Sequence, residues 1–317
     1  MRILFAGTPD MAIPSLEALS AQFSVVGVLT APDAPVGRKR TLTPSPVAAR
    51  AGELGLPLLR PQRLDAVCRE EVAALSPELL VCVAYGKIFG PRFLALFPKG
   101  GINLHPSLLP RHRGPSPIPA AILAGDRETG ITVQRLAEQM DAGDVLVQER
   151  FPLTGQETTG ELTERVSVDG AELLVSAIRR IAEGREQAVP QDHDAATYCG
   201  LITSADGWID WSLDAGAINR AVRAYSPWPS AHTLLHDVRL SIHECEPVPA
   251  ESAPSSAAEP GSVVSVDKKI GILVQTGSGL LSIRRLQLQS RNPLDWNSFA
   301  NGHRDLVGTV LGGRTTA

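Results

Sequence analysis

The feature that most restricts the fold of this chain is an uninterrupted apolar run over residues 79–84, Leu-Leu-Val-Cys-Val-Ala. A strand that is apolar at every position must be covered on both faces, as in parallel sheets that lie between two layers of helices. The start of the chain has the matching pattern, with an apolar strand over 2–7, helical spacing over 11–19 and a β-rich run over 23–30. Strand, helix and strand at this pitch predict a Rossmann-like α/β domain with a parallel sheet.

The first turn of this domain does not have the pattern of a dinucleotide site. Residues 7–10 read Gly-Thr-Pro-Asp, so the Gly-x-Gly-x-x-Gly fingerprint is missing, and Pro9 lacks the N–H that a pyrophosphate would need. We interpret these residues as a structural turn.

The second half of the chain has a different organisation. Periodicity is lost after a long amphipathic helix expected over 158–182, and a series of short β-rich runs follows, which is typical of a small OB-like β-barrel. Since 317 residues leave room for two domains, we place an α/β domain at 1–188, a linker at 189–205 and a barrel domain at 206–317. The β-rich runs cover 230–235, 238–242, 261–265, 271–275 and 280–288.

Charge and cysteine content limit the classes of function. The formal net charge of −4 gives no overall attraction for nucleic acid, so an anionic partner must be held by local basic clusters. The four cysteines have neither metal-ligand nor redox spacing, so we expect reduced thiols, no metal and a cytoplasmic protein. No apolar run reaches the roughly 18 residues of a membrane span, and we expect no targeting segment because the first strand begins at residue 2.

One such basic cluster lies in residues 31–46, which are too rich in proline and too polar to predict a regular element. We expect a long loop whose tip carries Arg38, Lys39 and Arg40. Three neighbouring basic residues are most often a solvated surface run. Long loops in compact domains are nevertheless often functional, so an anion-binding arm stays open as an alternative.

Residues 101–110, Gly-Ile-Asn-Leu-His-Pro-Ser-Leu-Leu-Pro, predict a strand that ends at a reaction centre. Side chains alternate faces along a strand, so Asn103 and His105 should point to the same side at its end. Pro106 and Pro110 oppose continuation of the strand, so the backbone must leave the sheet there. Residues 84–86 follow the neighbouring strand and should lie beside this pair.

An amide and an imidazole at one point suit the attack of an amine on an activated carbonyl. The amide can donate to the developing oxyanion, and the imidazole can handle the surplus proton on nitrogen. A carboxylate is then needed to orient the imidazole, and Asp141 is a candidate because residues 141–144 form a turn between two predicted strands. A hydrogen-bonded structural histidine at His105 and an Asx-turn at Asp141 remain the alternatives.

Several short motifs lie along nearly the whole length of the chain in a characteristic order and spacing. The motifs are 5–10 (Phe-Ala-Gly-Thr-Pro-Asp), Gly37-Arg38 with 44–47, 83–86 (Val-Ala-Tyr-Gly), 103–105 with 107–110, Arg113-Gly114, Asp141 with Gly143-Asp144, 209–211 (Ile-Asp-Trp) and 223–229 (Arg-Ala-Tyr-Ser-Pro-Trp-Pro). In these motifs the chain resembles the methionyl-tRNA formyltransferase family.

The resemblance implies a formyltransferase fold with a C-terminal barrel that helps to hold tRNA. It implies transfer of a formyl group from 10-formyltetrahydrofolate to the α-amine of methionyl-initiator tRNA. The residues that it implies are Asn103, His105 and Asp141 for catalysis, and Ser107, Leu108, Leu109 and Pro110, with Tyr85 and Gly86 nearby, for folate. The loop with Arg38, Lys39 and Arg40 suits the phosphates of an acceptor stem.

The barrel is not net basic, since residues 206–317 contain 10 Lys or Arg against 11 Asp or Glu. Basic patches such as Arg220/Arg223, Lys268/Lys269 and Arg284/Arg285 would therefore have to contribute to holding tRNA. Two other functions remain open: a formyltransferase that acts on an amino-sugar nucleotide, and a folate or RNA binder without activity. The cationic loop favours tRNA over a sugar nucleotide, and the three catalytic residue types argue against a mere binder.

Overall fold

The computed structural model describes residues 1–37, 40–249, 251 and 258–312, and these residues form two compact units. The first unit comprises Met1–Pro117, Glu128–Pro152 and Leu162–Gly200, and the second comprises Ile118–Arg127, Leu153–Glu161 and Leu201–Ala317. Residues 189–200, from the predicted linker, therefore pack in the first unit. Among helices of the described residues, none is both long and apolar enough to cross a membrane.

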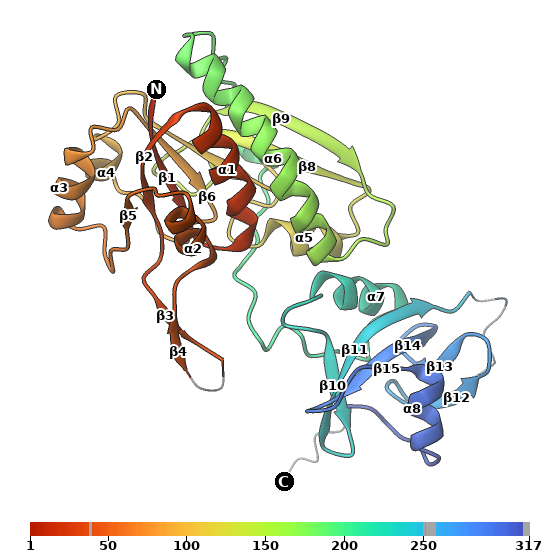
Figure 1. The fold of residues 1–317 in the computed structure, drawn as a ribbon. Helices are drawn as coiled ribbons and strands as arrows, with labels where there is room; N and C mark the ends of the chain where they lie inside the picture. The colour runs from red at the N-terminus through yellow and green to blue at the C-terminus, as the bar shows by residue number, and fades with distance from the viewer. Residues whose placement is uncertain (38–39, 250, 252–257, 313–317) are drawn as a thin grey trace. The chain divides into compact units, whose positions relative to one another are not determined.

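The first unit is built on a seven-stranded sheet in the order β5-β2-β1-β6-β7-β8-β9 (Figure 1). Its first five strands in this order pair in parallel, and β7, β8 and β9 pair antiparallel. The predicted parallel α/β domain is thus confirmed, with an antiparallel extension at one edge. The strands are β1 (Arg2–Gly7), β2 (Ser24–Leu29), β5 (Leu58–Leu59), β6 (Leu79–Val83), β7 (Gly101–His105), β8 (Glu128–Arg135) and β9 (Val145–Pro152).

Helices cover both faces of this sheet, which explains the apolar run in β6, where every residue is buried. Leu80 and Cys82 pack with Cys68 and Val72 of α3 on one face, and Leu104 packs against Gly170 of α6 on the other. Helices α1 and α6 lie side by side (Figure 1). The helices of the first unit are η1 (Asp10–Ala12), α1 (Ile13–Gln22), α2 (Pro46–Glu53), α3 (Ala66–Ala74), α4 (Pro91–Leu94), most of α6 (Thr159–Ala182) and η2 (His193–Ala195).

The prediction that residues 31–46 form no regular element is wrong. β3 (Ala34–Val36) and β4 (Thr41–Thr43) pair as an antiparallel hairpin, which projects as a narrow arm in Figure 1. Pro35 is tolerated because proline can occupy an edge strand, where the missing N–H costs no ladder bond. Of the predicted cationic tip, Arg40 is exposed, and its N–H donates to the Gly37 carbonyl across 3.1 Å. Arg38 and Lys39 lie outside the described residues.

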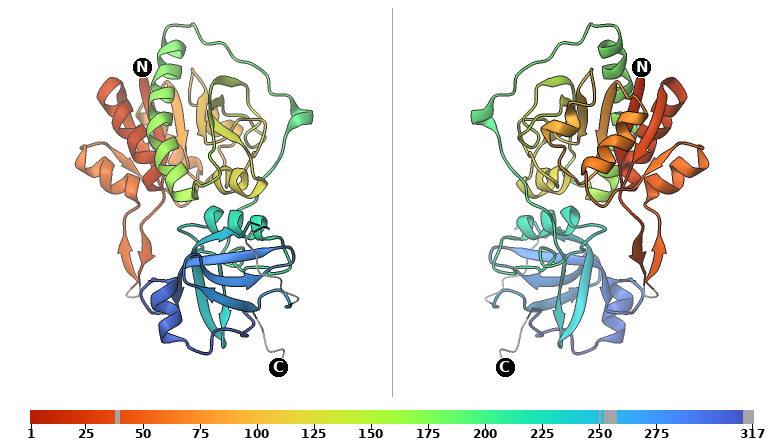
Figure 2. Two further views of the ribbon diagram at one scale, coloured as in Figure 1. Left: turned by 90° about the vertical axis from the view of Figure 1, so that its right-hand side faces the viewer. Right: turned by 90° about the vertical axis from the view of Figure 1, so that its left-hand side faces the viewer.

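The second unit contains an antiparallel sheet that forms a half-barrel, which confirms the predicted C-terminal β fold (Figure 2). Its core includes Trp211, Ile218, Val274 and Phe299, all nearly inaccessible to solvent. Strand β15 and helix α8 were not predicted. The elements are α5 (Pro117–Ala124), α7 (Ala215–Ala224), β10 (His232–Leu235), β11 (Val238–Pro247), β12 (Val263–Asp267), β13 (Gly271–Gln275), β14 (Leu280–Leu288), β15 (Leu294–Asp295) and α8 (Trp296–Gly302).

Candidate active site

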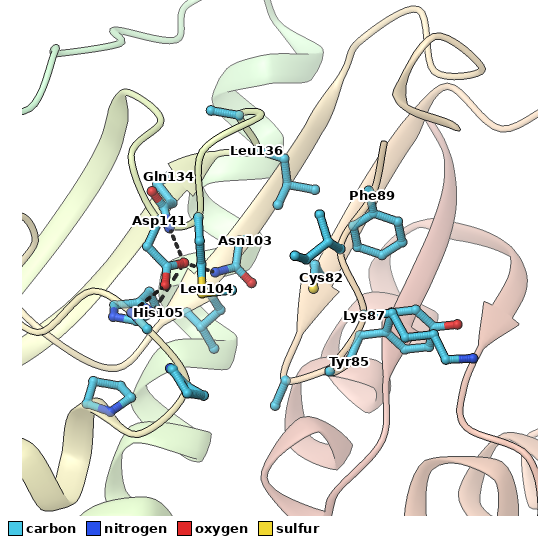
Figure 3. A pocket seen from close by; sticks show the side chains of 18 of the residues that line it. Cys82, Tyr85, Lys87, Phe89, Asn103, Leu104, His105, Gln134, Leu136 and Asp141 are labelled. Carbon is cyan, nitrogen blue, oxygen red and sulfur yellow. Dashed lines mark hydrogen bonds and ion pairs between the residues drawn. The ribbon is translucent and has the colours of Figure 1, made fainter. Parts of the chain in front are cut away.

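A cavity of about 290 Å³ opens at the carboxyl ends of β6 and β7 in the first unit. Parallel strands end at the same edge of a sheet, so the residues that follow them meet there. Apolar side chains form one part of the wall and polar side chains another (Figure 3). The lining includes Met11, Cys82, Ala84, Tyr85, Gly86, Phe89, Asn103, His105, Gly114, Gln134, Leu136, Met140 and Asp141.

Polar groups converge on the carboxylate of Asp141 (Figure 3). Its Oδ1 accepts from Gln134 Nε2 at 2.9 Å and, over a longer 3.4 Å, from Asn103 Nδ2, while His105 Nδ1 lies 3.6 Å away. Its Oδ2 accepts from the Gly114 N–H at 2.8 Å. The prediction that Asn103 and His105 point to the same side is confirmed, and both face the carboxylate that the sequence singled out.

The position of Asp141 depends on a tight turn between β8 and β9. Asp141 has a φ of 53°, in the left-handed region. Two residues later the backbone of Gly143 passes so close to β8 that an added Cβ would lie 1.9 Å from the Arg135 carbonyl oxygen. Only glycine fits there, so the turn is held against the sheet and the carboxylate is directed over the end of β7.

His105 is 4% exposed, and its ring orientation is fixed by the backbone. Nε2 lies 2.9 Å from the His112 carbonyl oxygen, which can only accept, so Nε2 carries the proton in the neutral ring. Burial lowers the pKa of His105 below its ordinary value, and this effect exceeds the opposing influence of Asp141 and of the His112 carbonyl. The neutral form at pH 7 has a lone pair on Nδ1, which makes Nδ1 a base.

Burial of His105 predicts a loss of stability in acid. Because its folded pKa lies below the unfolded value of 6.5, the unfolded chain binds more protons here as the pH falls. His105 makes its full contribution to the free energy of unfolding above about pH 6.5. This contribution decreases as the pH falls from 6.5 to the pKa of His105 in the folded protein. Urea unfolding between about pH 7.5 and 5 should therefore show a steeper decline for the wild type than for His105→Gln. If the free energy of unfolding has the same pH dependence in both proteins, burial of His105 does not cause the loss of stability in acid.

The residues that the resemblance implies for folate fall into two groups. Tyr85 and Gly86 line the cavity, and the buried Tyr85 ring stacks on Phe89 with a centroid separation of 5.4 Å. Ser107, Leu108, Leu109 and Pro110 are not among the lining residues.

The Ser107 to Pro110 turn is instead anchored to neighbouring backbone and to β8. Ser107 is fully buried, and its hydroxyl donates to the Arg111 carbonyl at 2.7 Å. Thr132 Oγ1 donates to the Ser107 carbonyl at 2.6 Å. A folate contact by this turn stays a prediction.

Two side chains next to the site, Gln134 and Gln191, were not singled out from the sequence, and Arg113 entered only as part of the Arg113-Gly114 motif, without a role. For Gln134 the sequence shows only a polar side chain near the end of β8, and its pairing with Asn103 across β7 and β8 is seen only in the fold. Gln191 had no signal in the sequence, because it lies in a segment without periodicity. Within the described part of the chain, no group of three or more His, Cys, Asp or Glu is placed to hold a metal ion.

Comparison of the sequence with known proteins shows which family the chain belongs to. The formyl transferase model matches residues 1–178, and the model of the formyl transferase C-terminal domain matches residues 201–304. A methionyl-tRNA formyltransferase of Treponema denticola is 45% identical over 316 residues, which covers 97% of this chain and 98% of the relative. The chain belongs to the methionyl-tRNA formyltransferase family.

Other members of the methionyl-tRNA formyltransferase family match over a similar length. The protein of Treponema pallidum is 46% identical over 320 residues, covering 98% of this chain and 99% of the relative. That of Chloroflexus aggregans is 42% identical over 304 residues, covering 95% and 97%. The family resemblance seen in the sequence motifs is thus confirmed.

Solved structures of two other formyltransferases and of HypX share the fold. WlaRD, a sugar 3N-formyl transferase, has a TM-score of 0.65 at 16% identity over 92% of this chain and 99% of its own. The N-formyltransferase of Helicobacter canadensis has a TM-score of 0.64 at 17% identity over 89% and 98%. HypX from Aquifex aeolicus, solved with tetrahydrofolic acid, has a TM-score of 0.62 at 17% identity over 97% of this chain and 48% of its own.

Proposed function

We propose that this protein transfers the formyl group of 10-formyltetrahydrofolate to the α-amino group of methionyl-initiator tRNA, in the cytoplasm, for translation initiation. Membership of the methionyl-tRNA formyltransferase family supports this substrate pair. The observation that carries the chemistry is the convergence of Asn103, His105 and Asp141 at one end of the cavity.

The reaction begins with attack of the neutral amine on the formyl carbon. An α-amino group titrates near pH 7.7–8.0 in peptides, so a useful fraction is already neutral at pH 7. The larger tasks are to hold the amine and the formyl carbon in attack geometry and to stabilise the tetrahedral oxyanion. Asn103 Nδ2 suits the second task, because its 3.4 Å bond to Asp141 is long and the amide can turn to the oxyanion.

Attack leaves a surplus proton on the amine nitrogen, and His105 is placed to take it. Its pKa is lowered by burial, so Nδ1 is free of a proton before the reaction. Once Nδ1 is protonated, the Asp141 carboxylate 3.6 Å away stabilises the imidazolium. The intermediate then collapses with cleavage of the bond between the formyl carbon and N10 of folate, and His105 returns the proton to that leaving nitrogen.

The cavity has room for a flat aromatic ring beside these groups. Cys82, Phe89 and Leu136 supply apolar wall, and Tyr85 and Gly86 complete it. We assign folate to this region, with the turn from Ser107 to Pro110 as a further predicted contact. The roles proposed for the protein side chains require no metal ion.

For tRNA, the hairpin tip with Arg38, Lys39 and Arg40 is our proposed contact to the acceptor stem, and residues 206–317 are the proposed tRNA-binding domain. Within the half-barrel, Arg284 is paired with Glu246 at 2.8 Å and Arg285 with Glu244 at 3.7 Å. These two arginines are already partly neutralised, which favours the hairpin as the main phosphate contact.

Single-turnover formylation tests this function. The protein is mixed with 10-formyltetrahydrofolate and offered charged initiator tRNA or amino-sugar nucleotides in parallel. We expect formyl-methionyl-tRNA and no formylated sugar. Formylation of the sugar nucleotide alone would replace this function with the alternative, and no transfer to either acceptor would leave only a binding protein.

Neutralising Arg38 and Lys39 with glutamine should weaken tRNA binding and flatten its salt dependence. Each neutralised phosphate contributes about 0.7–0.9 to the slope of log affinity against log salt, so the slope should decrease by roughly that amount for each phosphate that the variant no longer binds. The measurement is tRNA affinity at several salt concentrations. Arg92 and Lys99, both exposed, provide a control with the same change of charge. An unchanged slope would show that the tip does not contact phosphate.

A further inference from the structure

We propose that Gln191 is a positioning residue for Asp141, and that it acts through a directed chain of side-chain hydrogen bonds that starts at the buried Arg113. The inference rests on the proposed formyl transfer and adds to it a residue that does not line the cavity. Arg113 and Gln191 are 1% and 7% exposed, and both belong to the first unit.

Arg113 sets the direction of the chain. A guanidinium has only donors, so every partner of its nitrogens must accept. Its Nε and Nη2 donate to Gln191 Oε1 at 3.1 and 2.7 Å, its Nη1 donates to Tyr198 Oη at 3.1 Å, and its Nη2 also meets His193 Nδ1 at 3.1 Å. The Gln191 amide is therefore fixed with its oxygen towards Arg113 and its NH₂ group on the opposite side.

The NH₂ group of Gln191 is directed at the turn that carries Asp141. Nε2 donates to the carbonyl oxygens of Asp141 at 2.9 Å and Gly143 at 2.7 Å, and it lies 3.2 Å from Gln134 Oε1. One side chain thus holds the backbone of the turn at two points and also contacts the next amide in the chain.

Gln134 links Gln191 to the Asp141 carboxylate, and its amide orientation is fixed by Gln191. Because its Oε1 faces the donor group of Gln191, its Nε2 must face the other way, and it donates to Asp141 Oδ1 at 2.9 Å. Asp141 Oδ1 therefore faces an amide donor. Arg113 determines this orientation through a chain of three hydrogen bonds, from Arg113 to Gln191, from Gln191 to Gln134 and from Gln134 to Asp141. Reversal of either amide would place an oxygen against Asp141 or against a carbonyl, at the cost of a buried unpaired group.

The segment around Gln191 is bonded to the site along its length. The Arg113 N–H donates to the Thr197 carbonyl and the Cys199 N–H to the Arg113 carbonyl, both at 2.8 Å, and the His112 N–H donates to Thr197 Oγ1 at 2.8 Å. Before Gln191, Val189 exchanges backbone hydrogen bonds of 2.8 and 2.9 Å with Val145, so the segment is held on both sides of Gln191 although it lies about fifty residues beyond the turn. A residue held in this way can control the position of Asp141 without touching a substrate.

Gln191→Glu tests the proposal with almost no change in shape. The carboxylate still accepts from Arg113 and pairs with its charge, which offsets part of the cost of the substitution, but it has no donor for the turn or for Gln134. Gln187→Glu makes the same chemical change at an exposed position in the same unit and is the matched control. Arg113→Lys is a second variant that keeps one donor for Gln191. It serves if Gln191→Glu does not fold.

The readouts are the single-turnover rate at saturating 10-formyltetrahydrofolate and methionyl-tRNA, the Kd of folate and the thermal midpoint. We expect Gln191→Glu to lower the rate about 10- to 100-fold, by analogy with residues that orient metal ligands through hydrogen bonds, with the Kd of folate changed by less than about twofold. Arg113→Lys should show a smaller loss of rate, and Gln187→Glu should match the wild type. A wild-type rate in Gln191→Glu, or in Arg113→Lys if that is the variant that folds, overturns the proposal.

A double-mutant cycle with Asp141→Asn separates positioning from general structural support. If Gln191 acts through Asp141, adding Gln191→Glu to Asp141→Asn should cost less than about threefold in rate. An equal loss in both backgrounds, or a loss that follows the thermal midpoint, overturns the proposal. A wild type that transfers no formyl group overturns the proposed function instead, so the two failures are distinguishable.

Discussion

Asp141→Asn should lower the single-turnover rate of formyl transfer by up to about 10⁴-fold, the loss seen when the carboxylate partner of a catalytic histidine becomes an amide. Asp141 accepts from Gln134 on one oxygen and from the Gly114 N–H on the other, so an amide NH₂ at either position meets a donor. The charge that stabilises protonated His105 is lost as well. Rapid-quench measurement with saturating substrates gives the rate directly.

Asp144→Asn is the matched control for this change. Asp144 is exposed in the same turn, and the substitution alters charge by the same amount. We expect a rate close to that of the wild type. If Asp141→Asn remains within about threefold of the wild type, the carboxylate has no part in proton transfer and the assigned role of Asp141 fails.

Asn103→Ala should cost about 2.7–4 kcal/mol of transition-state stabilisation, which is about 10²- to 10³-fold in rate, as for loss of a donor to an oxyanion elsewhere. The side chain lines the cavity at the end of β7, and its Nδ2 makes only the 3.4 Å bond to Asp141 in the described structure. Because this bond is weak, its removal should change the free energy of unfolding little, while the loss of the oxyanion donor should reduce the rate strongly.

Asn103→Asp sharpens the same test. It replaces the donor with a carboxylate next to Asp141 Oδ1, so the loss of rate should be at least as large as for Asn103→Ala. Asn301→Ala, at an exposed position, controls for the substitution itself. Unchanged turnover in Asn103→Ala would contradict the oxyanion role, and a raised KM with unchanged kcat would indicate a binding role instead.

Local patterns were sufficient for most of the first unit. The apolar run of β6 and the alternation in β7 are properties of short segments, so the strands and the shared direction of Asn103 and His105 could be predicted. The hairpin of β3 and β4 could not. Its strands are three residues each and exposed, so they carry neither an apolar face nor a period.

The sequence by itself determined the buried parallel strands and the placement of an amide and an imidazole at the end of β7, because each depends on residue type within a few positions. Asp141 was one candidate carboxylate among others at that level. Only the tertiary structure decided that it lies beside Asn103 and His105 and how it is held. Gln191 meets Asp141 from 50 positions away and Arg113 from 78, and the direction of its amide follows from donor and acceptor geometry. The spacing of residues along the sequence does not reveal such hydrogen bonds, because they form only after the chain has folded.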